Sequence, residues 1–167
     1  MIDIDEDIDQ AWMRPKEGFA LGNDEEEEDS VQFGQTCVDR LLSGIGDTVM
    51  LPLIGQLVQN TIANESDWRY KNAGILAFSQ VGEYVDEPSK IAAMIPVIVQ
   101  HMQHPNPKIR HAALHCVGQI ADDMPEEFQK AFHADLVPPM IASLDDPVPR
   151  VVSHACAAMT NFFENAH

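Results

Sequence analysis

The sequence predicts an all-α protein, an α-solenoid in which antiparallel helix pairs stack side by side. Two observations predict it. Apolar residues recur with helical spacing in three segments that align with one another, and a proline recurs at one phase upstream of each segment. Equivalent helical faces that recur about every forty positions bury a continuous core when successive hairpins stack. The 167 residues are enough for about three helix pairs and one preceding helix.

The aligned segments are the predicted second helices of the pairs. They begin at Tyr70, Ile109 and Val151, so the offsets between them are 39 and 42 residues. Apolar or small residues fall at i, i+4, i+7, i+8 and i+11 of each segment, which is one face of an α-helix. The expected buried columns are Tyr70/Ile109/Val151, Gly74/Ala113/Ala155, Ala77/Cys116/Ala158, Phe78/Val117/Met159 and Val81/Ile120/Phe162.

The first helix of each pair is marked by a proline. Pro52, Pro96 and Pro138 lie among apolar residues at spacings of 44 and 42. Proline is tolerated in a first turn and kinks a helix interior, so each unit is expected to contain a helix start or a bend there. Asn, Asp and Pro in the turns are expected to cap or break the helices. The turns lie at 64–67, 104–107 and 145–147.

The array is expected to cover residues 30–167. It divides into a lone helix at 30–45 and three repeats at 47–84, 89–124 and 126–165. A solenoid normally closes with atypical repeats that have a polar outer face, and neither end of this array has that pattern. We therefore expect the chain to be a piece of a longer array.

Residues 1–29 differ in composition from the array. They carry twelve acids and two bases, a net charge of −10 out of −17 for the whole chain. Trp12 and other large apolar residues are scattered among the acids, which leaves two interpretations open: a solvated linker, or a segment that latches onto a partner or onto its own array. Six consecutive acids end this segment: Asp24, Glu25, Glu26, Glu27, Glu28 and Asp29. Such a run of like charges repels itself, so a flexible acidic segment or loop is expected.

The composition argues against several classes of function. The negative charge would repel a phosphate backbone, so direct nucleic-acid binding is disfavoured, and basic protein segments are the natural partners. No stretch approaches the roughly 20 apolar residues of a membrane span. His111 and His115 have the spacing of two zinc ligands, but no further ligands converge in the sequence, and no phosphate-binding loop or nucleophile motif occurs. We expect no metal, no cofactor and no catalysis.

The repeat unit resembles the HEAT repeat, in which an acid near the turn precedes a basic residue and paired small residues. Residues 108–113 carry this resemblance best. The sequence also resembles the central HEAT repeats of the importin-beta superfamily, most closely those of the karyopherin beta-3 or importin five type. The resemblance covers nearly all of residues 30–164. The strings that carry it are DWRYKNAGILAFSQVGE, HPNPKIRHAALHCVGQIADD and EEFQKAFHADLVPPMIASLDD.

This resemblance implies a nuclear transport receptor that shuttles between cytoplasm and nucleus. Its implied partners are basic nuclear localisation signals of cargo proteins, Ran-GTP and nucleoporins, and the family has an acidic insertion where residues 1–29 lie. A HEAT-repeat scaffold subunit of the phosphatase type, without Ran dependence, is the alternative. A metal-dependent HEAT enzyme is a third hypothesis, but the sequence lacks the His-Glu pairs of HEAT-repeat hydroxylases.

Two polar columns of the second helices are candidate binding residues. An amide column and an acidic column lie three residues apart, so they share a helix face opposite the apolar one. Amides can bond the backbone of an extended peptide, and acids can pair with its Lys and Arg side chains. The alternative is that these are ordinary exposed polar residues. The columns are Gln80/Gln119/Asn161 and Glu83/Asp122/Glu164.

Overall fold

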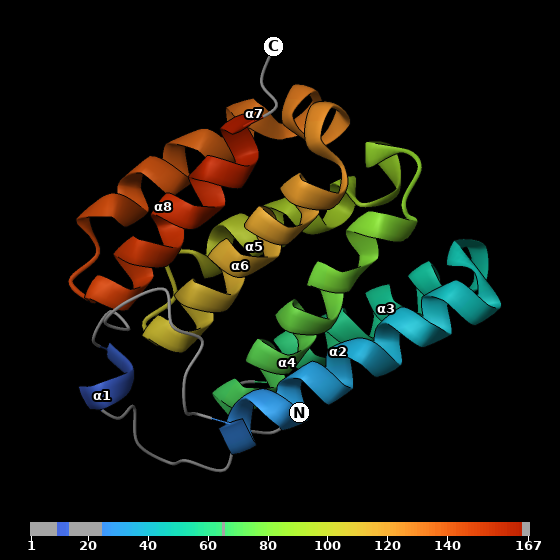
Figure 1. Cartoon of the computed structure of the whole chain (residues 1–167), viewed down its shortest axis with the longest axis horizontal. Coiled ribbons are helices and arrows are strands. Elements are labelled where there is room, and N and C mark those ends of the chain that lie inside the picture. Colours follow the sequence, from blue (N-terminus) through green and yellow to red (C-terminus); the bar gives the residue numbers. More distant parts are fainter. Residues whose placement is uncertain (1–9, 14–24, 65, 165–167) are drawn as a thin grey trace.

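The computed structural model describes residues 10–13, 25–64 and 66–164, and all regular secondary structure in these residues is helical. Figure 1 shows the helices in successive antiparallel pairs. The first helices are α3 (Asp47–Ile62), α5 (Ile95–His101) and α7 (Pro125–Ala142), and the second helices are α4 (Trp68–Phe78), α6 (Pro107–Asp123) and α8 (Pro149–Glu164). The other elements are α1 (Gln10–Met13), α2 (Glu25–Ile45), and the 3₁₀ helices η1 (Ser79–Tyr84), η2 (Pro88–Lys90), η3 (Ala92–Met94) and η4 (Ser143–Asp145). The prediction of an all-α solenoid is confirmed.

The second helices form one layer, in which α6 lies between α4 and α8 (Figure 1). Helix α6 also contacts α5 and α7 of the first-helix layer, so it is the central element of the array. The segment η1 continues α4 and packs on both α6 and α2. Because the second helices run side by side, their starts lie along one edge of the layer and their ends along the other.

One continuous core runs through the pairs, as the aligned columns predict. Each of the helices α2 to α8 contributes a side chain that is at most 1% exposed. Examples are Leu42, Val58, Ile75, Ile98, Ile109, Phe128 and Phe162. Burial of apolar surface on this scale is the main favourable contribution to folding.

Tyr70 departs from its predicted column. Its side chain is 39% exposed, whereas Ile109 and Val151 in the same column are fully buried. The neighbouring Lys71 is buried instead, and its Nζ donates to the carbonyl of Ile62 at 2.6 Å. The first turn of α4 therefore turns a different residue inward from the equivalent turns of α6 and α8.

The predicted caps and prolines are present. The side chain of Asp67 accepts from the Arg69 amide at 3.0 Å, and that of Asn106 accepts from the Lys108 amide at 2.9 Å, so each begins a second helix. Pro96 lies in the first turn of α5. Pro52 and Pro138 lie inside α3 and α7.

The boundary of the acidic segment was predicted wrongly. Helix α2 begins at Glu25, so residues 25–29 belong to a helix rather than to a loop. Carboxylates in a first turn are favoured by the positive end of the helix dipole. Asp24 lies outside the described residues. Helix α2 ends at Ile45, and Gly46, with a φ of 94°, supplies the left-handed turn into α3.

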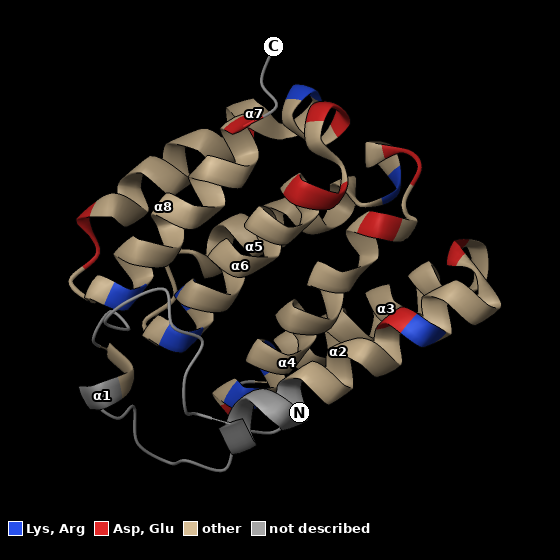
Figure 2. Ribbon diagram, in the orientation of Figure 1, with Lys and Arg blue, Asp and Glu red and all other residues tan. Residues whose placement is uncertain are grey.

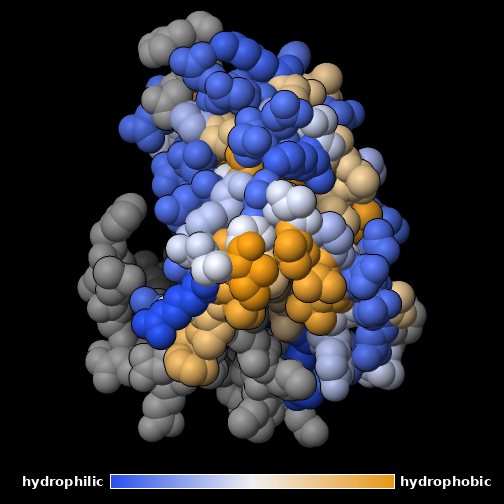
Figure 3. Space-filling view, turned by 90° about the vertical axis from the view of Figure 1, so that its right-hand side faces the viewer, coloured by the Kyte–Doolittle hydropathy of each residue, from blue (hydrophilic) through white to orange (hydrophobic). Residues whose placement is uncertain are grey.

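Apolar side chains also lie on the surface of α2 and α3. Figure 3 shows apolar side chains gathered on the face that includes these helices. Ile45, Val49, Leu53 and Leu57 are each about half exposed, and the last three follow one stripe of α3. The described array thus presents an apolar face beside its first helix pair. No helix among the described residues is both long and apolar enough to cross a membrane.

Candidate protein-binding surfaces

The two ends of the second helices differ in the charged residues they carry (Figure 2). The end that we call basic carries Arg69, Lys71, Lys108, Arg110 and Arg150, near the starts of α4, α6 and α8. Asp67 and Asp146 also lie there, paired with Arg69 and Arg110. The acidic end is formed by Glu83, Asp122, Asp123 and Glu164, near the ends of η1, α6 and α8. The helix dipole disfavours bases at a helix start and acids at a helix end, so helix stability does not explain this distribution.

The acidic end brings together residues from two repeats. Glu83 and Asp122 are exposed, and both lie close enough to Asp123 to raise its pKa. Burial is the larger cause of that raised pKa, because Asp123 packs against Gly82. A Cβ atom on Gly82 would lie 2.7 Å from Asp123 Oδ2, so the glycine permits this approach. The structure thus concentrates negative charge where η1 meets α6.

The three predicted amides are half-buried and hydrogen-bonded within the chain. Gln80 Nε2 donates to Ser79 Oγ at 3.0 Å, and Gln119 Nε2 donates to Asp123 Oδ1 at 3.0 Å. Asn161 Nδ2 reaches the carbonyl of Gly118 at 3.2 Å, which joins α8 to α6. One N–H donor of each amide is therefore used to hold the fold.

The three predicted acids are all exposed. Glu83 lies in η1, where side chains three residues apart are eclipsed, so it lies directly above Gln80. Asp122 lies in the last turn of α6, and Glu164 ends α8. These carboxylates are therefore accessible to a partner, whereas the amides are partly covered. Of the acidic run, Glu25 to Asp29 are placed only as backbone of α2.

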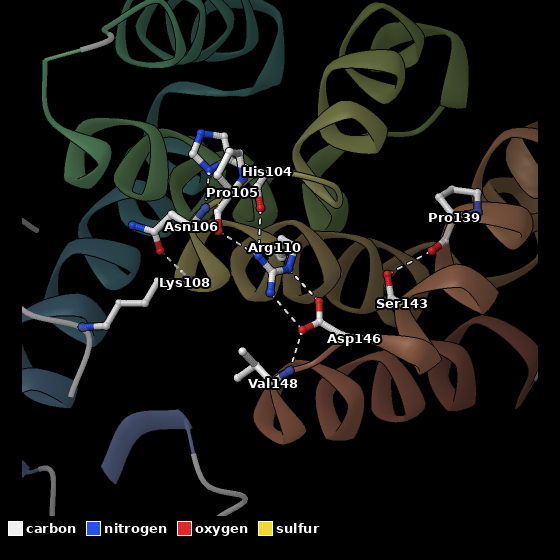
Figure 4. Close-up of polar contacts among 9 residues, drawn as sticks. All are labelled: His104, Pro105, Asn106, Lys108, Arg110, Pro139, Ser143, Asp146 and Val148. Atoms are coloured by element: carbon white, nitrogen blue, oxygen red, sulfur yellow. Dashed lines mark hydrogen bonds and ion pairs between the residues drawn. The ribbon is translucent and has the colours of Figure 1, made fainter. Parts of the chain in front are cut away.

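At the basic end, Arg110 forms a network that joins two repeats (Figure 4). Its Nε and Nη2 donate to the two carboxylate oxygens of Asp146 at 2.6 and 2.9 Å. Its Nη1 donates to the carbonyls of His104 and Pro105 at 2.9 and 3.0 Å. Asp146 also accepts from the Val148 amide at 2.8 Å. Arg110 is therefore a structural residue that connects the turns of consecutive repeats.

Three histidines of α6 and α8 form a stack beside this network. The rings of His111 and His154 are 4.0 Å apart between centroids, and those of His115 and His154 are 5.5 Å apart. Burial lowers the pKa of all three, and for His154 the charges of His115 and Arg150 lower it further, to about 4. The stack is therefore uncharged at neutral pH.

This stack predicts that the protein loses stability in mild acid. A group whose folded-state pKa is depressed binds more protons in the unfolded chain, so stability rises with pH. With an unfolded pKa near 6.5, His154 alone should lower the free energy of unfolding by about 2 kcal/mol between pH 7 and pH 5. Urea denaturation at the two pH values measures this loss. The variant His154→Asn should show a loss smaller by about that amount, and an equal loss in both proteins would contradict the assignment.

No three acidic, histidine or cysteine side chains converge as metal ligands among the described residues. The predicted candidates His111 and His115 face another histidine, while Cys116 is fully buried in the apolar column. Burial raises the pKa of the Cys116 thiol, so it stays protonated. The arrangement suits packing and surface recognition.

Comparisons with known proteins agree with an architecture of helical repeats. The family model of the HEAT repeat matches residues 94–124, which cover α5 and α6. Importin subunit beta-3 of Saccharomyces cerevisiae is 25% identical over 168 residues, which is 99% of this chain and 15% of that protein. These matches support a HEAT-repeat fragment of the importin-beta superfamily. Importin subunit beta-1 of Schizosaccharomyces pombe is 23% identical over 83% of the chain, and that of S. cerevisiae is 24% identical over 77%. This HEAT-repeat chain spans about 15% of the length of these relatives.

Several residues of this HEAT-repeat chain were not identified as functional or structural from the sequence. Nothing in the sequence pattern distinguished Asp123 from its neighbour Asp122. Asp146 was predicted as a turn residue but not as the partner of Arg110, and no contact was predicted for His154. The alignment did place His154 at the same helix position as Ala112, one residue after His111, so contact across repeats could have been anticipated.

Trp12 of α1 lies near the basic end. Helix α1 contacts α8, and the Trp12 ring lies near Arg150 and His111. For residues 10–13, this favours the interpretation of a segment that latches onto its own array over that of a solvated linker.

Proposed function

We propose that this chain is part of a nuclear transport receptor that binds basic segments of cargo proteins and responds to Ran-GTP. The observation that carries the proposal is its similarity to importin beta subunits, which extends over 99% of the chain for importin subunit beta-3. In this proposal the receptor shuttles between cytoplasm and nucleus and contacts nucleoporins on the way.

The acidic end is the proposed site for cargo. Glu83, Asp122 and Glu164 are exposed at the ends of successive second helices, on a chain of net charge −17. Such a surface attracts Lys and Arg side chains over long range and pairs with them on contact. These acids lie where the helix dipole disfavours them, which is consistent with a role in binding rather than in stability. The amides Gln80, Gln119 and Asn161 each use one N–H donor within the fold. They would contact a cargo backbone through the remaining polar groups of their side chains.

Charge reversal tests this site. The double variant Glu83→Lys/Asp122→Lys should bind a lysine-rich peptide of about twelve residues at least tenfold more weakly in isothermal titration, because two attractive contacts become repulsive. Circular dichroism should show unchanged helicity, since both side chains are exposed.

A matched variant separates local pairing from net charge. Asp135→Lys/Asp145→Lys makes the same change in net charge at exposed positions of α7 and η4. It should weaken binding of the lysine-rich peptide by no more than about threefold at 0.15 M salt, where distant charges are screened. Equal losses in the two variants, or unchanged affinity in the first, would remove the acidic end as a cargo site.

Ran separates a transport receptor from a HEAT-repeat scaffold subunit. GTP-loaded Ran should displace the bound lysine-rich peptide from the chain, and GDP-loaded Ran should not. Fluorescence anisotropy of a labelled peptide measures the displacement. The same response to both nucleotide states would favour a scaffold without Ran dependence.

A further inference from the structure

The starts of α6 and α8 hold the side chain of Trp12 between charged and aromatic groups. The guanidinium carbon of Arg150 lies 4.8 Å from the centroid of the Trp12 ring, and its Nη1 donates to the Trp12 carbonyl at 3.3 Å. Lys108 Nζ lies 5.7 Å from the same ring, and the His111 ring meets it edge-on at 5.5 Å between centroids. We call Lys108, His111 and Arg150 the tryptophan notch.

The notch is supported by neighbours that belong to the array. Lys108 is only 8% exposed, and its Nζ also lies 5.2 Å from the ring of Trp68, so it is held between two indoles. His111 is supported from behind by His154, 4.0 Å away. A cation held over an aromatic face is attracted to the ring, and more strongly when the pair is desolvated. The geometry thus provides a preformed site for one indole ring.

The charge of the surrounding sequence complements the notch. The nine residues before α1 include five acids and no base. The edge of the array that receives Trp12 carries the basic residues Lys71, Lys108 and Arg150, beside Arg69 and Arg110, which pair with Asp67 and Asp146. An acidic segment is attracted to this edge over long range, and its indole then supplies the specific contact.

We propose that the tryptophan notch is a binding site for a tryptophan within an acidic segment, and that such a segment of a partner protein binds there in competition with α1. Trp12 of α1 occupies the notch in cis. The notch lies at the starts of the second helices, whereas the acidic end that is proposed to bind basic cargo lies at their other ends. The two proposals can therefore be tested independently.

Competition follows from the tether that joins α1 to the array. Eleven residues separate α1 from α2, and a connection this short in sequence gives an effective concentration on the order of 1 mM. A free segment with a Kd on the order of 100 μM would therefore bind about tenfold more weakly while α1 is in place. Removal of Trp12 from the tethered segment should expose the notch.

The test uses the full chain and a fluorescein-labelled peptide with the sequence of residues 3–17. In fluorescence anisotropy, the peptide should bind Trp12→Ala about tenfold more tightly than it binds the unchanged chain. A peptide in which alanine replaces the tryptophan keeps the same charge and should lose at least tenfold in affinity. Equal affinity for the two chains, or for the two peptides, would overturn the proposal.

Two arginine variants in the Trp12→Ala chain locate the binding site. Arg150→Gln removes the guanidinium that stacks on the indole and should abolish peptide binding at concentrations up to about 1 mM. Arg40→Gln removes the same charge from an exposed position of α2 and should leave binding within about twofold. Equal loss with both variants would show that only overall charge matters.

A second measurement does not require Trp12→Ala to fold. The chain has two tryptophans, so Trp68→Phe leaves Trp12 as the one fluorophore of its kind. Arg150→Gln should increase acrylamide quenching of Trp12, because the released indole becomes exposed, and Arg40→Gln should not. Unchanged quenching in Arg150→Gln would overturn the proposal.

Discussion

Replacing Arg110 with methionine should lower the free energy of unfolding by about 3–4 kcal/mol. Arg110 and Asp146 are 12% and 6% exposed, and they form a two-bond ion pair between consecutive repeats. Removing one partner of a buried pair leaves the other as an uncompensated charge, which is among the most destabilising single changes. The carbonyls of His104 and Pro105 would also lose their shared donor. Urea denaturation followed by circular dichroism measures the loss.

Two further variants test the physical cause. Arg110→Met/Asp146→Asn should be more stable than Arg110→Met by about 1–2 kcal/mol, because no charge is left buried and the amide oxygen can still accept from the Val148 amide. Arg40→Met, at an exposed position of α2, should change stability by less than about 0.5 kcal/mol. A cost below about 1 kcal/mol for Arg110→Met would show that the pair does not hold the repeats together.

Replacing Gly118 with valine should cost about 2–3 kcal/mol. Gly118 lies where α6 meets α8, and a Cβ atom at this position would lie 3.1 Å from the Cα and 3.3 Å from the Cβ of Ala158. The backbone of α8 cannot move aside as a flexible side chain can, so the two helices must separate, and overpacking of this kind costs 1–3 kcal/mol. Asn161, which donates to the Gly118 carbonyl, would lose its bond as the helices part.

Gly55 offers a matched control for this substitution. It lies inside α3, and a Cβ atom there would meet nothing within 4 Å. Valine has a better helix propensity than glycine, so Gly55→Val should be neutral or stabilising by up to about 0.5 kcal/mol. Thermal denaturation of the two variants compares them directly. Equal effects would mean that helix propensity, and not the close approach of α6 and α8, governs Gly118.

The close approach at Gly118 also bears on the binding surfaces. Helix α6 supplies residues to the acidic end through Asp122 and to the tryptophan notch through Lys108 and His111. A shift of α6 against α8 would therefore disturb both surfaces at once. Arg110 and Gly118 keep this spacing from two sides, one by a buried ion pair and one by the absence of a side chain.

The helices, their pairing and most buried columns were predictable because they depend on short-range patterns. Ile109, Ala113 and Ile120 repeat at helical spacing, and Asp67 and Asn106 cap the helices that follow them. Helical periodicity and capping involve residues within a few positions of one another. The accessible acids Glu83, Asp122 and Glu164 could be named for the same reason, since each lies opposite the apolar face of its own helix.

Contacts between repeats required the tertiary structure. The ion pair of Arg110 with Asp146, the stack of His111 on His154 and the docking of Trp12 on Arg150 join residues from 36 to 138 positions apart. Each depends on the distance and angle between successive helices, which are set by the packing of whole side chains rather than by a residue's neighbours in sequence. The pattern along the chain determines which face of a helix is buried, whereas only the assembled layers determine which residue of the next repeat lies against it.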